Sequence, residues 1–162
     1  MNTPVRNIMV FVDGTEESIT AAEYAIVMAK TLKAELRALY VVNTRALNEL
    51  VKTRIFLESE HEEYQRDLEQ DAARYLNHVK ELAHRKGVPV LTEEVSGTVH
   101  VEIKNKVMEH RIDLLVIGEI SQIRSRRDEM YNETERAMRS VPCCVLMAKD
   151  DEKIHELYEG LE

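Results

Sequence analysis

The fold is decided by the stretch Asn7-Ile-Met-Val-Phe-Val12, which runs directly into Asp13-Gly14-Thr15. The first six residues form an apolar, β-prone run. Such a run is typical of a strand that is buried on both faces and therefore belongs to a parallel sheet. Thr15 is a suitable helix N-cap, and Glu16 and Glu17 then fall where the helix dipole favours negative charge. The stretch predicts a strand, a tight turn and the start of a crossover helix.

The same alternation of strand and helix continues along the chain. Spacings of three and four between apolar residues predict a first helix that ends near Leu32. A capping box of Ser59 and Glu62 predicts the start of a long helix that Gly87 stops. The order predicts an α/β protein of the Rossmann-like type, an open parallel sheet with helices on both faces, whose ligands bind beyond the carboxyl ends of the strands. The other expected strands are 36–42, 88–95, 113–118 and 143–147, and the other expected helices are 44–58, 99–110 (capped by the turn Ser96-Gly97-Thr98) and 129–140.

Length, charge and cysteine content narrow the class of protein. The 162 residues predict one domain, which we place at residues 1–150, followed by an acidic tail, 151–162, that is either a short helix or frayed. A net charge of −8 argues against nucleic-acid binding, which needs a positive surface. The chain has neither an apolar run long enough to span a membrane nor a signal-peptide pattern, and its two adjacent cysteines cannot form a disulfide framework. We therefore expect a cytoplasmic protein without a membrane partner.

The common catalytic and metal-binding motifs are missing. The chain has no glycine-rich dinucleotide fingerprint, no Walker A motif and no nucleophile elbow. His61 is followed at the zinc-protease spacing by Gln65, and His78 and His84 point to different sides of one helix. We expect no catalytic residues and no metal site, with the histidines at surfaces or helix ends.

The adjacent cysteines are open to two readings. Cys143 and Cys144 are expected to be small strand residues on opposite faces of the sheet, buried as small apolar side chains. A redox or metal-binding role for the pair is the alternative.

Three segments, taken together, resemble the universal stress protein family. The opening I-M-V-F-V-D-G-T-E-E-S resembles that family's first strand and turn, and D-L-L-V-I-G at residues 113–118 resembles its fourth strand. The run S-V-P-C-C-V-L-M at residues 140–147 resembles its closing strand, with Cys144 in place of a proline. The resemblance covers residues 5–148. It implies a stress-response regulatory or protective protein with the strand order 3-2-1-4-5, usually a homodimer.

The resemblance also bears on nucleotide binding, because some members of the family bind ATP through a loop of the form G-x2-G-x9-G-[ST] after the fourth strand. Gly118 holds the first position, but Ser121, Tyr131 and Asn132 replace the remaining ones, and Arg124 replaces a further common glycine. Glycines let backbone N–H groups approach phosphate oxygens. Losing two such contacts weakens binding by roughly 10²–10⁴-fold. We therefore expect no ATP cofactor and no efficient ATP hydrolysis.

The alternative is an adenine-nucleotide sensor for ATP or AMP, and weak nucleotide hydrolysis is a more distant one. The loop carries Arg124, Arg126 and Arg127, and arginine can bind phosphate in a bidentate manner. Asp13 and Val41 match family positions near the adenine. Asn132 could cap the last long helix and contact an anion. The candidate nucleotide site then consists of Asp13, Val41, Gly118, Ser121, Arg124, Arg127 and Asn132.

The closing strand predicts the partner. Cys144, Val145, Leu146 and Met147 form an apolar run that would promote aggregation if it lay unpaired at the edge of a sheet. Antiparallel pairing with a second copy across a two-fold axis avoids this. The sequence therefore predicts a homodimer through the fifth strand, and we expect a further protein partner whose identity the sequence does not reveal.

Overall fold

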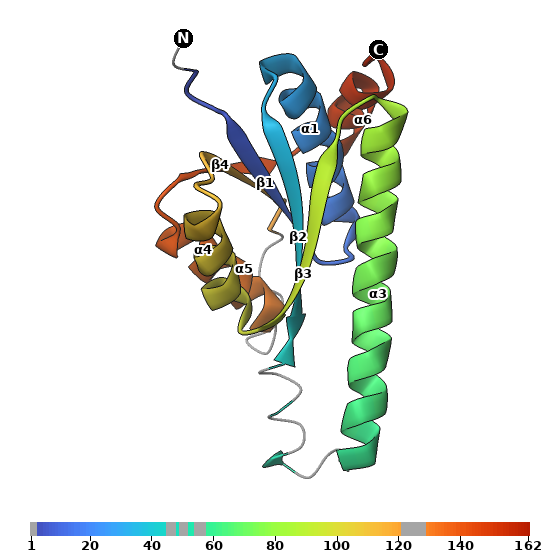
Figure 1. Ribbon diagram of the computed structural model, residues 1–162, viewed down its shortest axis with the longest axis vertical. Helices are drawn as coiled ribbons and strands as arrows, with labels where there is room; N and C mark the ends of the chain where they lie inside the picture. The colour runs from blue at the N-terminus through green and yellow to red at the C-terminus, as the bar shows by residue number, and fades with distance from the viewer. Residues whose placement is uncertain (1–2, 45–47, 49–51, 54–57, 121–128) are drawn as a thin grey trace.

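The computed structural model describes residues 3–44, 48, 52–53, 58–120 and 129–162. The five strands make one parallel sheet in the order β3-β2-β1-β4-β5, with helices on both faces (Figure 1). The predicted fold class and strand order are confirmed. The elements are β1 (Asn7–Val12), α1 (Glu16–Leu32), β2 (Glu35–Asn43), α3 (Glu58–Arg85), β3 (Val90–Gly97), α4 (Val99–Glu109), β4 (Leu114–Gly118), α5 (Glu129–Ser140), β5 (Cys144–Ala148) and α6 (Asp151–Glu159).

Strand β1 lies at the centre of the sheet and is buried on both faces, as its unbroken apolar run predicted. Ile8, Val10 and Val12 point into a core formed with α1, α3 and α6. Met9 and Phe11 point into a second core beneath α4 and α5. All five are at most 2% exposed, so β1 is the layer shared by the two cores.

Helix α1 packs closely on the sheet because small residues form its buried face. Ala21, Ala22, Ala25 and Ala29 are at most 2% exposed, together with Ile26. Alanine side chains let the helix backbone approach the strands, and this closeness matters at the end of β4, described below.

Several expected boundaries shift by one or two residues. Strand β3 runs over Val90–Gly97, so Ser96 and Gly97, expected in a turn, belong to the strand. Thr98 is the N-cap residue of α4. The structure describes every residue of this helix, and the Thr98 side chain makes no capping hydrogen bond to it. Asp113, expected within β4, precedes it and accepts hydrogen bonds from the backbone N–H groups of Arg6 and Asn7 at 2.8 and 2.9 Å.

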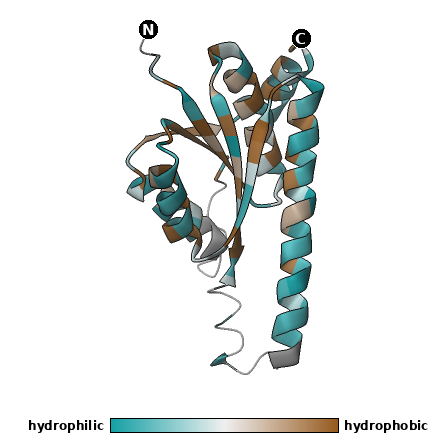
Figure 2. Cartoon of the chain, in the orientation of Figure 1, coloured by the Kyte–Doolittle hydropathy of each residue, from teal (hydrophilic) through white to brown (hydrophobic). Residues whose placement is uncertain are grey.

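Helix α3 has two different halves. It begins at Glu58, so Ser59 lies inside the helix and is not the predicted cap. Its second half buries Leu76 and Val79 against β2 and β3, whereas Tyr64 in the first half is 43% exposed. Figure 2 shows the corresponding change from mixed to mainly hydrophilic colouring along the helix. The helix expected at 44–58 falls mostly outside the described residues.

The C-terminal residues form a packed helix rather than a frayed end. Ile154 and Tyr158 of α6 are 3% and 2% exposed and belong to the core that α1 and α3 share. The buried Tyr158 hydroxyl donates a hydrogen bond of 2.7 Å to the backbone carbonyl of Leu82. Asp150 caps the helix by accepting the N–H of Lys153. Helix α6 is therefore anchored to both α1 and α3.

Candidate functional site

The turn after β1 is closed by its own hydrogen bonds. Asp13 Oδ1 accepts the N–H and the hydroxyl of Thr15 at 3.0 and 2.6 Å. Thr15 Oγ1 in turn accepts the N–H of Ser18 at 3.2 Å, which makes Thr15 the N-cap of α1, as predicted. One carboxylate oxygen of Asp13 is thus engaged in forming the turn.

Asp13 directly follows β1, and Val41 lies near the end of the neighbouring strand β2, two residues before its last residue. Val12 pairs with Tyr40 in the sheet, so Asp13 and Val41 take the next positions along β1 and β2. Val41 is 5% exposed and contributes to the core beneath α4 and α5. The fold therefore places these two candidate residues beside each other at the carboxyl edge of the sheet, where ligands of parallel sheets bind.

A pair of tyrosines fills the other side of the same turn. Tyr40 and Tyr75 stack with their ring centroids 6.4 Å apart and their planes 3° from parallel. A Cβ added to Gly14, which has φ of +85°, would lie 2.7 Å from the Tyr75 ring. Burial, together with the negative charge of Asp13, raises the pKa of Tyr40 to about 12, so the phenol stays neutral at physiological pH. No local sequence pattern indicates the contact between Tyr75 and Gly14, because only the packing of α3 brings the two together.

Gly118, the last residue of β4, is constrained by packing. A Cβ on Gly118 would lie 2.6 Å from the backbone carbonyl carbon of Glu17 and 2.8 Å from the backbone nitrogen of Ser18. Both atoms belong to the first turn of α1 and cannot move independently of it. Gly118 is therefore required for β4 and α1 to meet, whether or not a ligand approaches.

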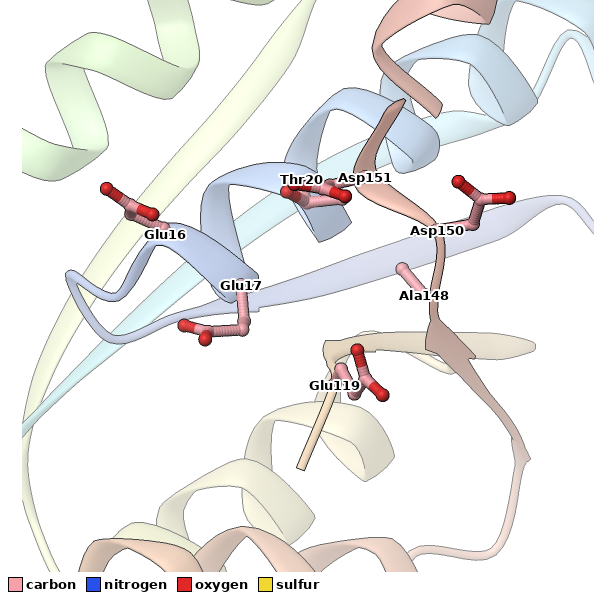
Figure 3. A pocket seen from close by; sticks show the side chains of 7 residues that line it. All are labelled: Glu16, Glu17, Thr20, Glu119, Ala148, Asp150 and Asp151. Carbon is pink, nitrogen blue, oxygen red and sulfur yellow. The ribbon is translucent and has the colours of Figure 1, made fainter. Parts of the chain in front are cut away.

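An acidic hollow lies beside this contact, and Figure 3 shows the side chains that line it. Its volume is about 170 Å³. It lies between the N-terminus of α1, the end of β4 and the connection from β5 to α6, and five of its seven lining residues carry carboxylates. The lining residues are Glu16, Glu17, Thr20, Glu119, Ala148, Asp150 and Asp151.

The acidic hollow disfavours phosphate groups. The N-terminus of a helix attracts anions, and α1 and α6 both begin at this place. Each helix already carries acidic residues in its first turn, Glu16 and Glu17 in α1 and Asp151 and Glu152 in α6. Glu119, the first residue after Gly118, adds another carboxylate. An incoming phosphate would meet like charge here.

The side chains of the other four candidate nucleotide-binding residues are outside the described part of the structure. Ser121, Arg124 and Arg127 fall outside the described residues. Asn132 lies in the first turn of α5, but its side chain is not among the described ones. The structure thus brings together Asp13 and Val41 and explains Gly118, and it leaves the role of the other four as predictions.

Three histidines make contacts that link separate elements. His100 in α4 pairs through Nδ1 with Glu133 of α5 at 2.5 Å, and its backbone N–H donates to the same carboxylate at 3.0 Å. Burial alone would raise the pKa of Glu133, but the hydrogen bonds from His100 outweigh it and lower that pKa. His155 in α6 contacts Glu23 of α1 at 2.9 Å.

The third of these histidines takes part in a cluster that sequence reasoning missed. His110, the C-cap residue of α4, lies beside Glu93 of β3, with Glu109 close by. The spacing of these residues along the chain gives no metal-binding motif, because only the packing of α4 on β3 brings them together.

The two cysteines differ from expectation. Cys143 is half-buried and precedes β5, and Cys144 is exposed, so the interpretation of both as buried strand residues is wrong: Cys143 lies outside the strand, and Cys144 is not buried. Burial raises the pKa of the Cys143 thiol. Strand β5 is an edge strand, as predicted, and Val145, Leu146 and Met147 are only partly covered.

None of the helices in the described part of the chain is long and apolar enough to cross a membrane.

Comparison with known proteins identifies relatives along nearly the whole chain. Residues 4–149 match the universal stress protein family. Universal stress protein MJ0531 of Methanocaldococcus jannaschii is 29% identical over 160 residues, which cover 94% of this chain and 91% of the relative.

Solved structures share the fold. The structure of protein MJ0577 superposes with a TM-score of 0.71 at 19% identity, covering 91% of this chain and 98% of that one. A universal stress protein family protein from Arabidopsis thaliana, solved with AMP bound, gives a TM-score of 0.63 at 17% identity, covering 91% and 94%. At these identities the likeness establishes the fold alone.

Proposed function

Because this chain belongs to the universal stress protein family, we propose that it acts in the cytoplasm as a dimeric regulatory or protective stress-response module that does not turn over ATP efficiently. The proposal assigns it no catalytic residue. Its action would depend on the presentation of a folded surface to itself and to a protein partner, rather than on chemistry at a nucleotide.

The observation that carries the proposal is the surrounding of Gly118. Of the glycines in the family's phosphate loop, Gly118 alone remains, and its contact with the Glu17 backbone gives it a packing role that needs no phosphate. Glu119, the residue after Gly118, lines the acidic hollow. Packing against α1 thus explains why a glycine occupies position 118, and the surrounding side chains are negatively charged.

The apolar β5 edge supports the dimer. Val145, Leu146 and Met147 are partly exposed on an edge strand, where backbone groups can pair with another strand. The opposite edge, β3, presents charged Glu93 and Glu94 instead. Charged side chains on an edge strand oppose pairing, so β5 is the better surface for a second copy.

Light scattering at micromolar concentration tests the dimer. The unmodified chain should have twice the monomer mass. Leu146→Glu should yield a monomer, because a two-fold axis brings two added carboxylates into one interface. The matched control is Leu91→Glu on the β3 edge, where Leu91 is 49% exposed, and it should remain dimeric.

Retained far-ultraviolet circular dichroism shows that each variant is folded. A monomeric unmodified chain, or a Leu146→Glu variant that is folded and still dimeric, would contradict the proposed interface. Release of inorganic phosphate from ATP at rates well above a buffer blank would contradict the absence of efficient turnover.

An adenine-nucleotide sensor is the second candidate, and the adjacency of Asp13 and Val41 favours it. The AMP-bound Arabidopsis relative shares the fold. Thermal unfolding with ATP, AMP and pyrophosphate separates the two functions. A ligand at a hundredfold excess over its Kd should stabilise a sensor by about 2.7 kcal/mol. Asp13→Ala should then abolish the shift.

A further inference from the structure

A group of metal-ligating side chains lies where the end of α4 meets β3. Glu93 comes from β3, and Glu109 and His110 come from the end of α4. Each offers one ligand atom, and these atoms all lie within 4.8 Å of one another. We propose that Glu93, Glu109 and His110 bind a divalent transition-metal ion, with Zn²⁺ as the best-fitting example.

The ligand set suits such an ion. One imidazole nitrogen and two carboxylate oxygens, completed by water, form a common kind of open zinc site. Zinc–ligand distances of about 2.0–2.2 Å place two ligand atoms at most about 4.4 Å apart. The side chains therefore need only small rotations to meet one ion. The imidazole favours zinc, copper or nickel over magnesium and calcium, which prefer oxygen ligands.

A cation already holds the two carboxylates together. The Lys106 ammonium lies 2.8 Å from Glu93 Oε2 and 2.8 Å from Glu109 Oε2. His110 Nε2 lies 2.9 Å from the other oxygen of Glu93. The carboxylates are therefore arranged around a positive charge before any metal arrives, and a dication would replace a monocation at a prepared position.

Lys106 is then the competitor of the metal. The hydrogen bonds that Lys106 donates to Glu109 and Glu93 raise the pKa of its ammonium group, so the side chain stays charged. Its flexible four-carbon stem allows the ammonium to rotate into water, where it is strongly hydrated. Glu109 is more than half exposed, so the site opens to solvent on the side from which an ion would enter.

His155 also contacts two glutamates, but in a different geometry. His155 contacts Glu23 through Nδ1 at 2.9 Å and Glu159 through Nε2 at 3.6 Å. The two carboxylates thus lie at opposite nitrogens of the ring and cannot share one ion with it. His155 therefore serves as a control that has the same residue types, one histidine and two glutamates. It tests whether the ligand atoms must point toward one position.

Calorimetric titration of the full chain with zinc chloride tests the proposal. The unmodified chain should bind one Zn²⁺ per chain. His110→Gln should weaken binding by at least about tenfold, since it removes the only nitrogen ligand of the set. Lys106→Met should strengthen it by about tenfold, because removal of the ammonium removes like-charge repulsion of the dication. His155→Gln should leave binding unchanged.

The Lys106 variant distinguishes a metal site from a purely structural ion-pair network. A structural network would give no zinc binding with either residue at position 106. Absence of binding at millimolar Zn²⁺ in both proteins, or equal binding by His110→Gln and the unmodified chain, would overturn the proposal. Circular dichroism establishes that each variant is folded, and ¹⁵N shifts of the His110 ring provide an independent readout of coordination.

Discussion

The ends of β1 and β4 lie at the same edge of the sheet but are built differently. After β1, Asp13 and Thr15 close a turn through side-chain hydrogen bonds, and Val41 lies near the end of the neighbouring strand β2. After β4, Gly118 is pressed against the backbone of α1, and Glu119 faces the acidic hollow. The first end combines a hydrogen-bonded polar turn with a buried apolar side chain. The second end keeps a glycine for packing and surrounds it with negative charge.

This contrast teaches that a retained motif residue need not retain the motif's function. Gly118 fits the phosphate-loop pattern, yet its contact with Glu17 already explains why no larger residue stands there. Asp13 likewise has a local role in the turn. The two ends can be told apart only by experiments that perturb one while leaving the other intact.

The largest expected effect is the destabilisation caused by Gly118→Ala. The added methyl group would clash with the Glu17 backbone, and overpacking of this kind costs about 2–3 kcal/mol. Urea unfolding without any nucleotide measures it. Gly160→Ala is the matched control. Gly160 has a helical φ, and a Cβ added there would lie 3.3 Å from its nearest neighbour, the backbone oxygen of Glu156. This variant should lose less than about 1 kcal/mol of unfolding free energy. A neutral Gly118→Ala would remove the packing explanation.

The next effect comes from restoring the glycine pattern of the phosphate loop. The double variant Ser121→Gly, Tyr131→Gly should bind ATP at least about tenfold more tightly than the unmodified chain, because it permits backbone N–H contacts with phosphate. Titration calorimetry with ATP measures the gain. An unchanged affinity would mean that the replaced side chains do not limit binding.

A smaller effect is expected from the charge of the acidic hollow. Glu119→Gln should strengthen pyrophosphate binding by about two- to threefold at low salt, and the gain should vanish at high salt as screening increases. Glu63→Gln removes an equal charge from the exposed half of α3, outside the hollow, and should change nothing. Equal effects of the two variants would show that only net charge matters.

The smallest expected effect is on the pH dependence of stability, through the contact between His155 of α6 and Glu23 of α1. The hydrogen bond that the His155 ring donates to Glu23 raises the pKa of His155, so folding favours the protonated ring. The stabilisation is therefore complete below the unfolded-state pKa of about 6.5 and is lost as the pH rises through the folded-state pKa. The free energy of unfolding of His155→Gln should fall below that of the unmodified chain at pH 5.5 and match it at pH 8.5. A larger difference at pH 8.5 would contradict this assignment.

The sequence predicts an element correctly where one local pattern dominates. The unbroken apolar run of β1 and the Thr15 cap predicted their elements correctly, because burial and capping act locally. Boundaries were less certain where side chains act at long range. The apolar pattern predicts Asp113 within β4, but Asp113 accepts hydrogen bonds from backbone groups more than 100 residues earlier in the chain, which no local pattern reveals.

The site was predictable only in part, for the same reason. Asp13, Val41 and Gly118 could be placed at the carboxyl edge because strand ends define that edge. The contact of Gly118 with α1, the stacking of Tyr75 and the meeting of Glu93 with His110 depend on packing between distant segments. Residue types alone carry no signal for such contacts.

Titration calorimetry of the unmodified chain with ATP is the most direct test of the central claim that the end of β4 no longer accepts a triphosphate. With about 0.1 mM protein, the account predicts no saturable heat up to about 1 mM ATP, which corresponds to a Kd in the millimolar range or weaker. A saturable isotherm with a micromolar Kd that Asp13→Ala abolishes would contradict it.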